Sequence, residues 1–165
     1  MLLPGGAAMM RARYSWISGL LLFAVLATGA PARAQEKEIT RKEVPEVVLA
    51  AFAKAYPKAT ILGYTTEVEN SQRIYEIEST QGKTHRDVTY SADGKVISVE
   101  ASLEFSELPA AVRAAFEKKF PGAKTLLAER VTKAGAAAPL FELHFEYEGK
   151  ELEIVYDAKG IEQKS

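Results

Sequence analysis

Apolar residues recur with a helical period in two separate parts of the chain. Pro45 and Pro109 stand where the first turn of each helix would form, and a proline costs little there because its missing N–H would have no partner. Pro57 and Pro121 disfavour the helical conformation in the residue before them. The pattern predicts two short helices, each ending at the aromatic residue before its second proline. The apolar positions are Val44, Val47, Val48, Ala51, Phe52, Ala55 and Tyr56 in the first helix, and Leu108, Val112, Ala115, Phe116 and Phe120 in the second.

Alternation of apolar and polar residues follows each predicted helix and indicates strands. Residues 75–78 alternate apolar and acidic side chains, and residues 141–148 do so more clearly, which is the period of a half-buried strand. Residues 152–156 return after a turn near Gly149, and Asp93-Gly94 is a strong hairpin signal. Each part of the chain therefore predicts a helix followed by three or four antiparallel strands.

An internal repeat relates the two parts. Residues 44–59 match residues 108–123 at eight of sixteen positions. A lone helix on a small sheet buries little apolar surface, whereas two such units can share one sheet. We therefore predict an α+β fold in which two tandem helix-plus-antiparallel-strands repeats, residues 44–105 and 106–165, form one sheet with both helices on one face. The other face would be left in water, as antiparallel sheets allow.

The first 34 residues have the pattern of a signal peptide. Arg11 and Arg13 precede an uncharged apolar run from Trp16 to Ala30, and Ala32-Arg33-Ala34 has the small residues of a cleavage site. This run is shorter than the roughly 20 residues that a membrane-spanning helix needs. We expect a periplasmic or secreted protein without a membrane span after cleavage. Residues 35–43 would then form a charged leader, interpreted as a flexible spacer.

Charge and cysteine content narrow the classes of function. Loss of residues 1–34 would remove three of the 21 basic residues and none of the 22 acidic residues, which leaves a net charge of −4. Nucleic-acid binding rewards a basic surface, so the composition argues against it. The chain has no cysteine, which excludes disulfides and thiol chemistry.

The repeated helix motif resembles that of a known family. Val-Pro-x-x-Val-x-x-Ala-Phe-x-x-x-Tyr-Pro-x-Ala at residues 44–59, its second copy, and the Tyr-x-x-x-Gly hairpins at Tyr90 and Tyr156 are similar to those of PepSY-like, β-lactamase-inhibitor-like exported proteins. The resemblance covers residues 40–165. It implies two tandem helix-plus-sheet units, as in β-lactamase inhibitory protein, and suggests inhibition or protein binding. The disulfides of that inhibitor have no counterpart here, and the resemblance supplies no catalytic residues.

The sequence does not support catalysis. A serine nucleophile needs a base that a third group orients, and the only histidines are His85 and His144. Serine stands in no G-x-S-x-G elbow, and the glycines form neither a P-loop nor a dinucleotide fingerprint. We therefore expect a non-enzyme that binds no cofactor.

Carboxylates gather on the predicted open face of the sheet, together with both histidines. A turn at Glu148-Gly149 would place His144 opposite Glu153 and Glu146 opposite Glu151. In the first repeat, a turn at Gln81-Gly82 would place His85 opposite Glu78 and Glu76 opposite Asp87. Imidazole and carboxylate groups can hold a divalent metal, for which the candidate ligands are His144, Glu142, Glu153, His85 and Glu78. The plainer interpretation is a solvated face with exposed ion pairs, in which Lys83, Arg86 and Lys150 balance the acids.

The same face could instead bind another protein. The candidate contact residues are Glu76, Glu78, Glu142, His144, Glu146 and Glu153, with Tyr64 and Tyr147 as exposed aromatic anchors near strand ends. The leading hypothesis is a non-enzymatic envelope protein that binds a protein or peptide, whose identity the sequence leaves unknown. The alternative is a periplasmic binder or sensor of a small ligand or divalent metal.

Overall fold

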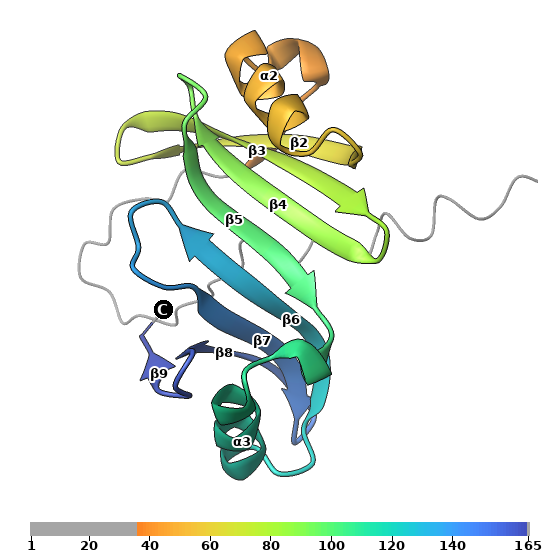
Figure 1. Cartoon of the computed structure of the whole chain (residues 1–165), viewed down its shortest axis with the longest axis vertical. Coiled ribbons are helices and arrows are strands. Elements are labelled where there is room, and N and C mark those ends of the chain that lie inside the picture. The colour runs from red at the N-terminus through yellow and green to blue at the C-terminus, as the bar shows by residue number, and fades with distance from the viewer. Residues whose placement is uncertain (1–35, 165) are drawn as a thin grey trace, which may run out of the picture.

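One nine-stranded antiparallel sheet organises the computed structural model, which describes residues 36–164 (Figure 1). The strands follow one another in the sheet in chain order. They are β1 (Lys37–Glu38), β2 (Thr60–Glu69), β3 (Gln72–Gln81), β4 (Thr84–Ser91), β5 (Val96–Leu103), β6 (Lys124–Lys133), β7 (Leu140–Tyr147), β8 (Lys150–Asp157) and β9 (Glu162–Gln163). The helices are α2 (Glu46–Ala55) and α3 (Ala110–Lys119), preceded by the 3-10 turns η1 (Arg41–Glu43) and η2 (Phe105–Glu107). The predicted signal peptide lies outside the described residues.

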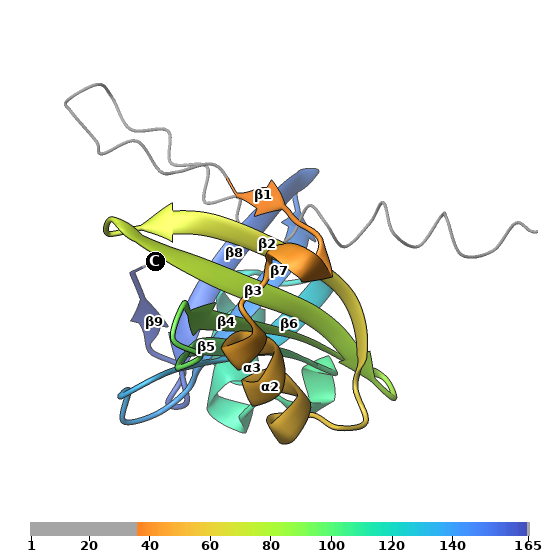
Figure 2. The same cartoon turned by 90° about the horizontal axis from the view of Figure 1, so that it is seen from above.

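Both helices pack on the same face of the sheet, which confirms the predicted architecture (Figure 2). Each repeat has its own core. In the first repeat, Val48 and Phe52 of α2 are buried with Ile77 and Val88 of the sheet. In the second, the buried cluster consists of Leu108, Val112, Phe116, Ala128, Phe141, Leu143, Phe145, Ile154 and Tyr156. Because the helices are only ten residues long, this packing rather than intrinsic propensity holds them.

The pairing of β5 with β6 joins the two repeats into one sheet. This ladder runs from Ser98 opposite Lys133 to Leu103 opposite Ala128. The two halves therefore share one continuous open face, although their cores are separate.

The open face is concave. Figure 2 shows the strands rising on both sides of β5, away from the helices, so that the sheet forms a trough. The register shifts between Ile61 and Gly63 in β2 and between Thr125 and Leu127 in β6, at corresponding places in the repeats. Such bulges bend a strand and increase its twist. The curvature brings open-face side chains of distant strands toward one another.

The segment before α2 belongs to the sheet from its first described residues. Lys37 and Glu38 pair with Thr66 and Thr65 of β2. The next turn is closed by a capping box, in which the backbone N–H of Thr40 donates to Glu43 at 2.8 Å. The interpretation of this leader as a flexible spacer is therefore wrong.

Gly160, in the turn between β8 and β9, is a position where a side chain should be costly. Its φ is +75°, and an added Cβ would collide with the carbonyl of Ala111 in α3 and lie 3.2 Å from the Cβ of Ala115. We expect Gly160→Ala to lower the free energy of unfolding by about 3 kcal/mol, because left-handed strain of about 1–2 kcal/mol adds to displacement of the helix. Urea unfolding would measure it.

Gly122 provides the matched control. Its φ is +79°, but a Cβ there meets nothing within 4 Å. Gly122→Ala should therefore cost only the strain, about 1 kcal/mol. Equal losses for the two variants would contradict the close packing of α3 on the β8–β9 turn.

Candidate functional site

Carboxyl groups from six neighbouring strands, β3 to β8, meet on the concave side of the sheet. We call this surface the acidic face. It consists of Glu76, Glu78, Asp87, Glu100, Glu129, Glu142 and Glu153, together with His85 and His144.

The strand register sets these side chains beside one another. Glu78 is opposite Asp87, which is opposite Glu100, so three carboxyl groups follow one another across β3, β4 and β5. Glu129 of β6 is opposite Glu142 of β7. Like charges in directly opposed positions destabilise a sheet unless another group compensates them.

The acidic face is not the solvated surface that the plainer interpretation expected. Asp87 is 5% exposed and Glu129 is 6% exposed, and Glu76 is half-buried. Asp87 and Glu129 lie on β4 and β6, on either side of β5, and the sheet rises beyond both of these strands (Figure 2). Carboxyl groups so placed are expensive to ionise without a partner.

Burial raises the pKa of several of these carboxyl groups. The pKa of Glu76 is raised to about 9; burial is the largest cause, and the charges of Asp87 and Glu36 contribute to the rise. Burial also raises the pKa of Asp87 to about 7, although His85 opposes that rise, and the pKa of Glu129 to about 7. At neutral pH Glu76 therefore keeps its proton, and Asp87 and Glu129 are partly protonated.

Each histidine is held by a carboxylate. The Nε2 atom of His85 lies 2.9 Å from Oε1 of Glu78, and its Nδ1 atom lies 3.7 Å from Oδ2 of Asp87. The hydrogen bond with Glu78 raises the pKa of His85. The Nε2 atom of His144 lies 2.8 Å from Oε1 of Glu142. Burial opposes the charged form of His144, but its hydrogen bond with Glu142 and the surrounding carboxylates raise its pKa overall.

The expected register is correct in the second repeat and wrong in the first. His144 is opposite Glu153 and Glu146 is opposite Glu151, as predicted. In the first repeat, however, His85 is opposite Thr80 and Glu76 is opposite Thr89. The central residues of that turn are Gly82 and Lys83, not Gln81 and Gly82, because Gln81 pairs with Thr84. His85 still reaches Glu78 diagonally.

The aromatic anchors do not lie on the acidic face. Tyr64 and Tyr147 are half-buried against the two helix-side cores, and the ring of Tyr147 packs edge-on to Phe120 at 5.5 Å. The expectation that both are exposed is therefore wrong. The acidic candidate residues do share one face, with Glu146 at its exposed rim.

Arg86 does not neutralise the acidic face either. It lies on the helix-bearing side, with its guanidinium carbon 4.4 Å from the centre of the Tyr56 ring. Lys133 is a basic residue that does act on the acidic face, where its charge lowers the pKa of Glu100 against the larger effect of burial.

Sequence reasoning missed Glu100 and Glu129. Their strands lie at the junction of the repeats, and only the β5–β6 pairing places them between the two predicted clusters. The spacing of the repeats does offer a signal for the rest of the face. A shift of 66 residues superposes Glu76 on Glu142, Glu78 on His144 and Asp87 on Glu153.

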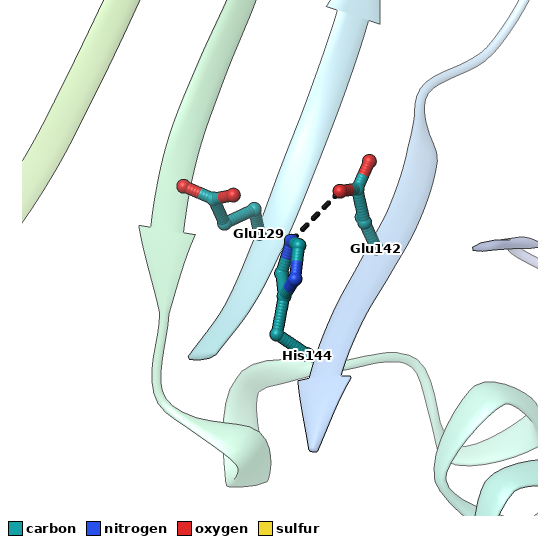
Figure 3. A group of neighbouring side chains, drawn as sticks. All are labelled: Glu129, Glu142 and His144. Atoms are coloured by element: carbon teal, nitrogen blue, oxygen red, sulfur yellow. Dashed lines mark hydrogen bonds and ion pairs between the residues drawn. The ribbon is translucent and has the colours of Figure 1, made fainter. Parts of the chain in front are cut away.

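Glu129 completes a group with two of the predicted metal ligands. One ligand atom from each of Glu129, Glu142 and His144 lies within 4.8 Å of the others. Figure 3 shows the His144 ring with the carboxyl group of Glu142 on one side, joined to it by a hydrogen bond, and the carboxyl group of Glu129 on the other. Carboxylate oxygen and imidazole nitrogen are both donors for divalent metals.

Three structures from Bacteroides species share this fold. A protein of B. eggerthii described as a putative periplasmic protein is 19% identical, with a TM-score of 0.63, and the match covers 73% of this chain and 86% of that one. A DUF2874 family protein of B. uniformis is 18% identical, with a TM-score of 0.61. The match covers 73% of this chain and 86% of that one. A BLIP-like protein of B. fragilis is 20% identical, with a TM-score of 0.58 and coverages of 73% and 84%.

Comparison with curated proteins gave no match. A family model described as "Putative beta-lactamase-inhibitor-like, PepSY-like" matches the chain twice in tandem, at residues 32–98 and 97–163. These segments follow the two repeats and together span most of the sequence. The chain therefore belongs to the PepSY-like, β-lactamase-inhibitor-like family.

Proposed function

We propose that this protein is a non-enzymatic, exported binding protein whose acidic face holds a positively charged segment of a partner protein or peptide. The observation that carries the proposal is the crowding of seven carboxyl groups in one trough, two of them at most 6% exposed. A lysine- or arginine-rich segment carries ammonium or guanidinium groups, which are positively charged and can donate hydrogen bonds to these carboxylates.

The raised pKa values support a cationic partner. Burial raises the pKa of Asp87 and Glu129 to about 7, so that both carboxyl groups are partly protonated at neutral pH. An approaching ammonium or guanidinium group would favour the ionised carboxylates, so binding would release protons. Affinity for a basic segment should therefore increase as the pH rises.

The environment of the histidines supports a role without catalysis. The Nε2 atoms of His85 and His144 are both engaged by carboxylates. In a general base that activates a serine, one ring nitrogen can be held by a carboxylate but the other must face the hydroxyl group, and Nδ1 of His85 faces Asp87 at 3.7 Å instead. The family resemblance, with its inhibitor-like members, fits binding better than turnover, although fold alone does not determine function.

Export is the second part of the proposal. The sequence begins with the pattern of a signal peptide, and a structural relative is described as a putative periplasmic protein. Among residues 36–164, no helix is long and apolar enough to cross a membrane. We therefore place the binding function in the periplasm or outside the cell.

A labelled lysine-rich decapeptide tests the proposal directly. Fluorescence anisotropy should show saturable binding that weakens with added salt, as charge-assisted binding does. The double variant Glu100→Gln/Glu142→Gln should lower the affinity by about tenfold, equivalent to about 1.4 kcal/mol. A glutamate-rich peptide of the same length should not bind.

The control is the double variant Glu46→Gln/Glu117→Gln. It removes the same charge from exposed positions on the two helices, on the opposite side of the sheet. Binding should be unchanged in this variant. If both double variants lost the same affinity for the peptide, the effect would come from net charge alone, and this would contradict a role for the acidic face.

A further inference from the structure

The second repeat contains a compact group of potential metal ligands that the first repeat lacks. Glu129 and Glu142 are directly opposite each other on β6 and β7, and His144 follows Glu142 on the same face. One ligand atom from each lies within 4.8 Å of the other two (Figure 3). The group combines two carboxylates with one imidazole, so it is more than an accumulation of acids.

Glu129 supplies an independent indication of a missing ligand. It is 6% exposed, and within residues 36–164 its carboxyl group accepts no hydrogen bond and forms no ion pair. Its carboxyl group is directed to the side of His144 opposite Glu142 (Figure 3). A carboxyl group in so buried a residue is costly to ionise when no protein group pairs with it. A dication between the three side chains would satisfy it.

We propose that Glu129, Glu142 and Nε2 of His144 bind a first-row transition-metal dication such as Zn²⁺. Imidazole favours these metals over Ca²⁺ and Mg²⁺, which prefer oxygen ligands alone. Zinc bonds of about 2.0–2.2 Å in a tetrahedral site place ligand atoms about 3.4 Å apart. Small side-chain rotations would close the group from its present 4.8 Å.

Binding would replace a proton by the metal. Nε2 of His144 now shares a hydrogen bond of 2.8 Å with Oε1 of Glu142. A metal can take both atoms only after that proton leaves, so metal binding and proton release are coupled. Three protein ligands leave a coordination position open, which a water or a donor group of another molecule would fill.

The other histidine forms a different arrangement and provides an internal control. Nε2 of His85 lies 2.9 Å from Glu78, while its Nδ1 lies 3.7 Å from Asp87. Carboxyl groups face both ring nitrogens and favour the protonated form of His85, which has no lone pair free to bind a metal. A dication is also a different ligand from the basic segment proposed above, and this site would remain even if no such segment bound.

Calorimetric titration with zinc chloride tests the site. The protein would be expressed from the full sequence, purified after export and freed of metal with a chelator. We expect saturable binding of one Zn²⁺ per chain, with a heat that changes with the ionisation enthalpy of the buffer because a proton is released. Glu129→Gln and His144→Ala should each weaken binding by at least about tenfold, whereas His85→Ala should leave it unchanged.

Cobalt gives a second readout, independent of heat. Co²⁺ bound through the imidazole of His144 should produce a visible absorption band that His144→Ala abolishes and Glu129→Gln alters. Circular dichroism would verify that each variant is folded. The site would be disproved by an absence of zinc binding in the unaltered protein, by zinc affinity that survives His144→Ala, or by equal losses in His85→Ala and His144→Ala.

Discussion

The stability of this protein should fall as the pH rises from about 5 to about 8, and Glu76 should be the main cause. Burial raises the pKa of its carboxyl group in the folded chain from 4.5 to about 9. The unfolded chain would therefore ionise Glu76 near pH 4.5, while the folded chain keeps the proton. Stability is complete below the unfolded pKa and is lost as the pH rises toward the folded pKa.

The expected loss from Glu76 is about 3 kcal/mol between pH 5 and pH 8, since each pH unit within the shifted range corresponds to at most about 1.4 kcal/mol. Asp87 adds to the loss because its pKa is also raised, to about 7. The raised pKa of His85 acts in the same direction, since its charged form is favoured in the folded state. Urea unfolding measured across this pH range would show the dependence.

Glu76→Gln should remove most of that dependence. Glutamine has a similar shape but no proton to lose, so the variant should be more stable than the unaltered protein at pH 8 and similar to it at pH 5. Glu117→Gln, on the exposed surface of α3, should leave the pH profile unchanged. A stability that increases from pH 5 to pH 8 in the unaltered protein would contradict the burial of the acidic face.

Phe116→Ala should cause the other large loss, about 3–5 kcal/mol of the free energy of unfolding. Phe116 is 2% exposed, and its ring contacts those of Phe105, Phe120 and Phe145, the last at 4.9 Å between ring centroids. Removing the ring leaves a cavity between α3 and the sheet, and the surrounding residues can fill it only in part. Thermal or urea unfolding would measure the loss.

Phe52→Ala is the matching change in the first repeat. Phe52 is also 2% exposed, but its ring makes a single aromatic contact in the described structure, with Tyr56 at 5.2 Å. Each aromatic pair adds about 0.5–1.5 kcal/mol beyond burial, so Phe116→Ala should cost more than Phe52→Ala. A larger loss for Phe52→Ala would contradict the dense aromatic packing assigned to the second core.

Local signals in the sequence were sufficient for most of the fold. The positions of the prolines predict where the helices end. In the structure α2 and α3 end at Ala55 and Lys119, each one residue before the expected aromatic residue. The turn at Glu148-Gly149 was also placed correctly. At Gly82 the same reasoning failed, because this glycine is the first central residue of its turn and Gly149 is the second. Composition alone does not distinguish these two positions.

The acidic face was only partly predictable because it depends on contacts between the repeats. Strand alternation identified Glu76, Glu142 and His144 as residues of one face. It gave no indication that Glu129 would lie opposite Glu142, which needs the pairing of β6 with β7. It also gave no measure of curvature, so the face was expected to be solvated. Burial follows from the bend of the whole sheet. Bulges at separate positions produce this bend.

We propose above that a cationic segment binds in the trough of the sheet. Backbone amide chemical shifts, recorded during titration with the lysine-rich decapeptide, locate the binding surface without relying on any substitution. The proposal predicts that the shifts concentrate on β3 to β8, around Glu78, Asp87, Glu100 and Glu142, with little change in α2 and α3. Shifts that instead concentrate on the two helices, or an absence of shifts at saturating peptide, would contradict it.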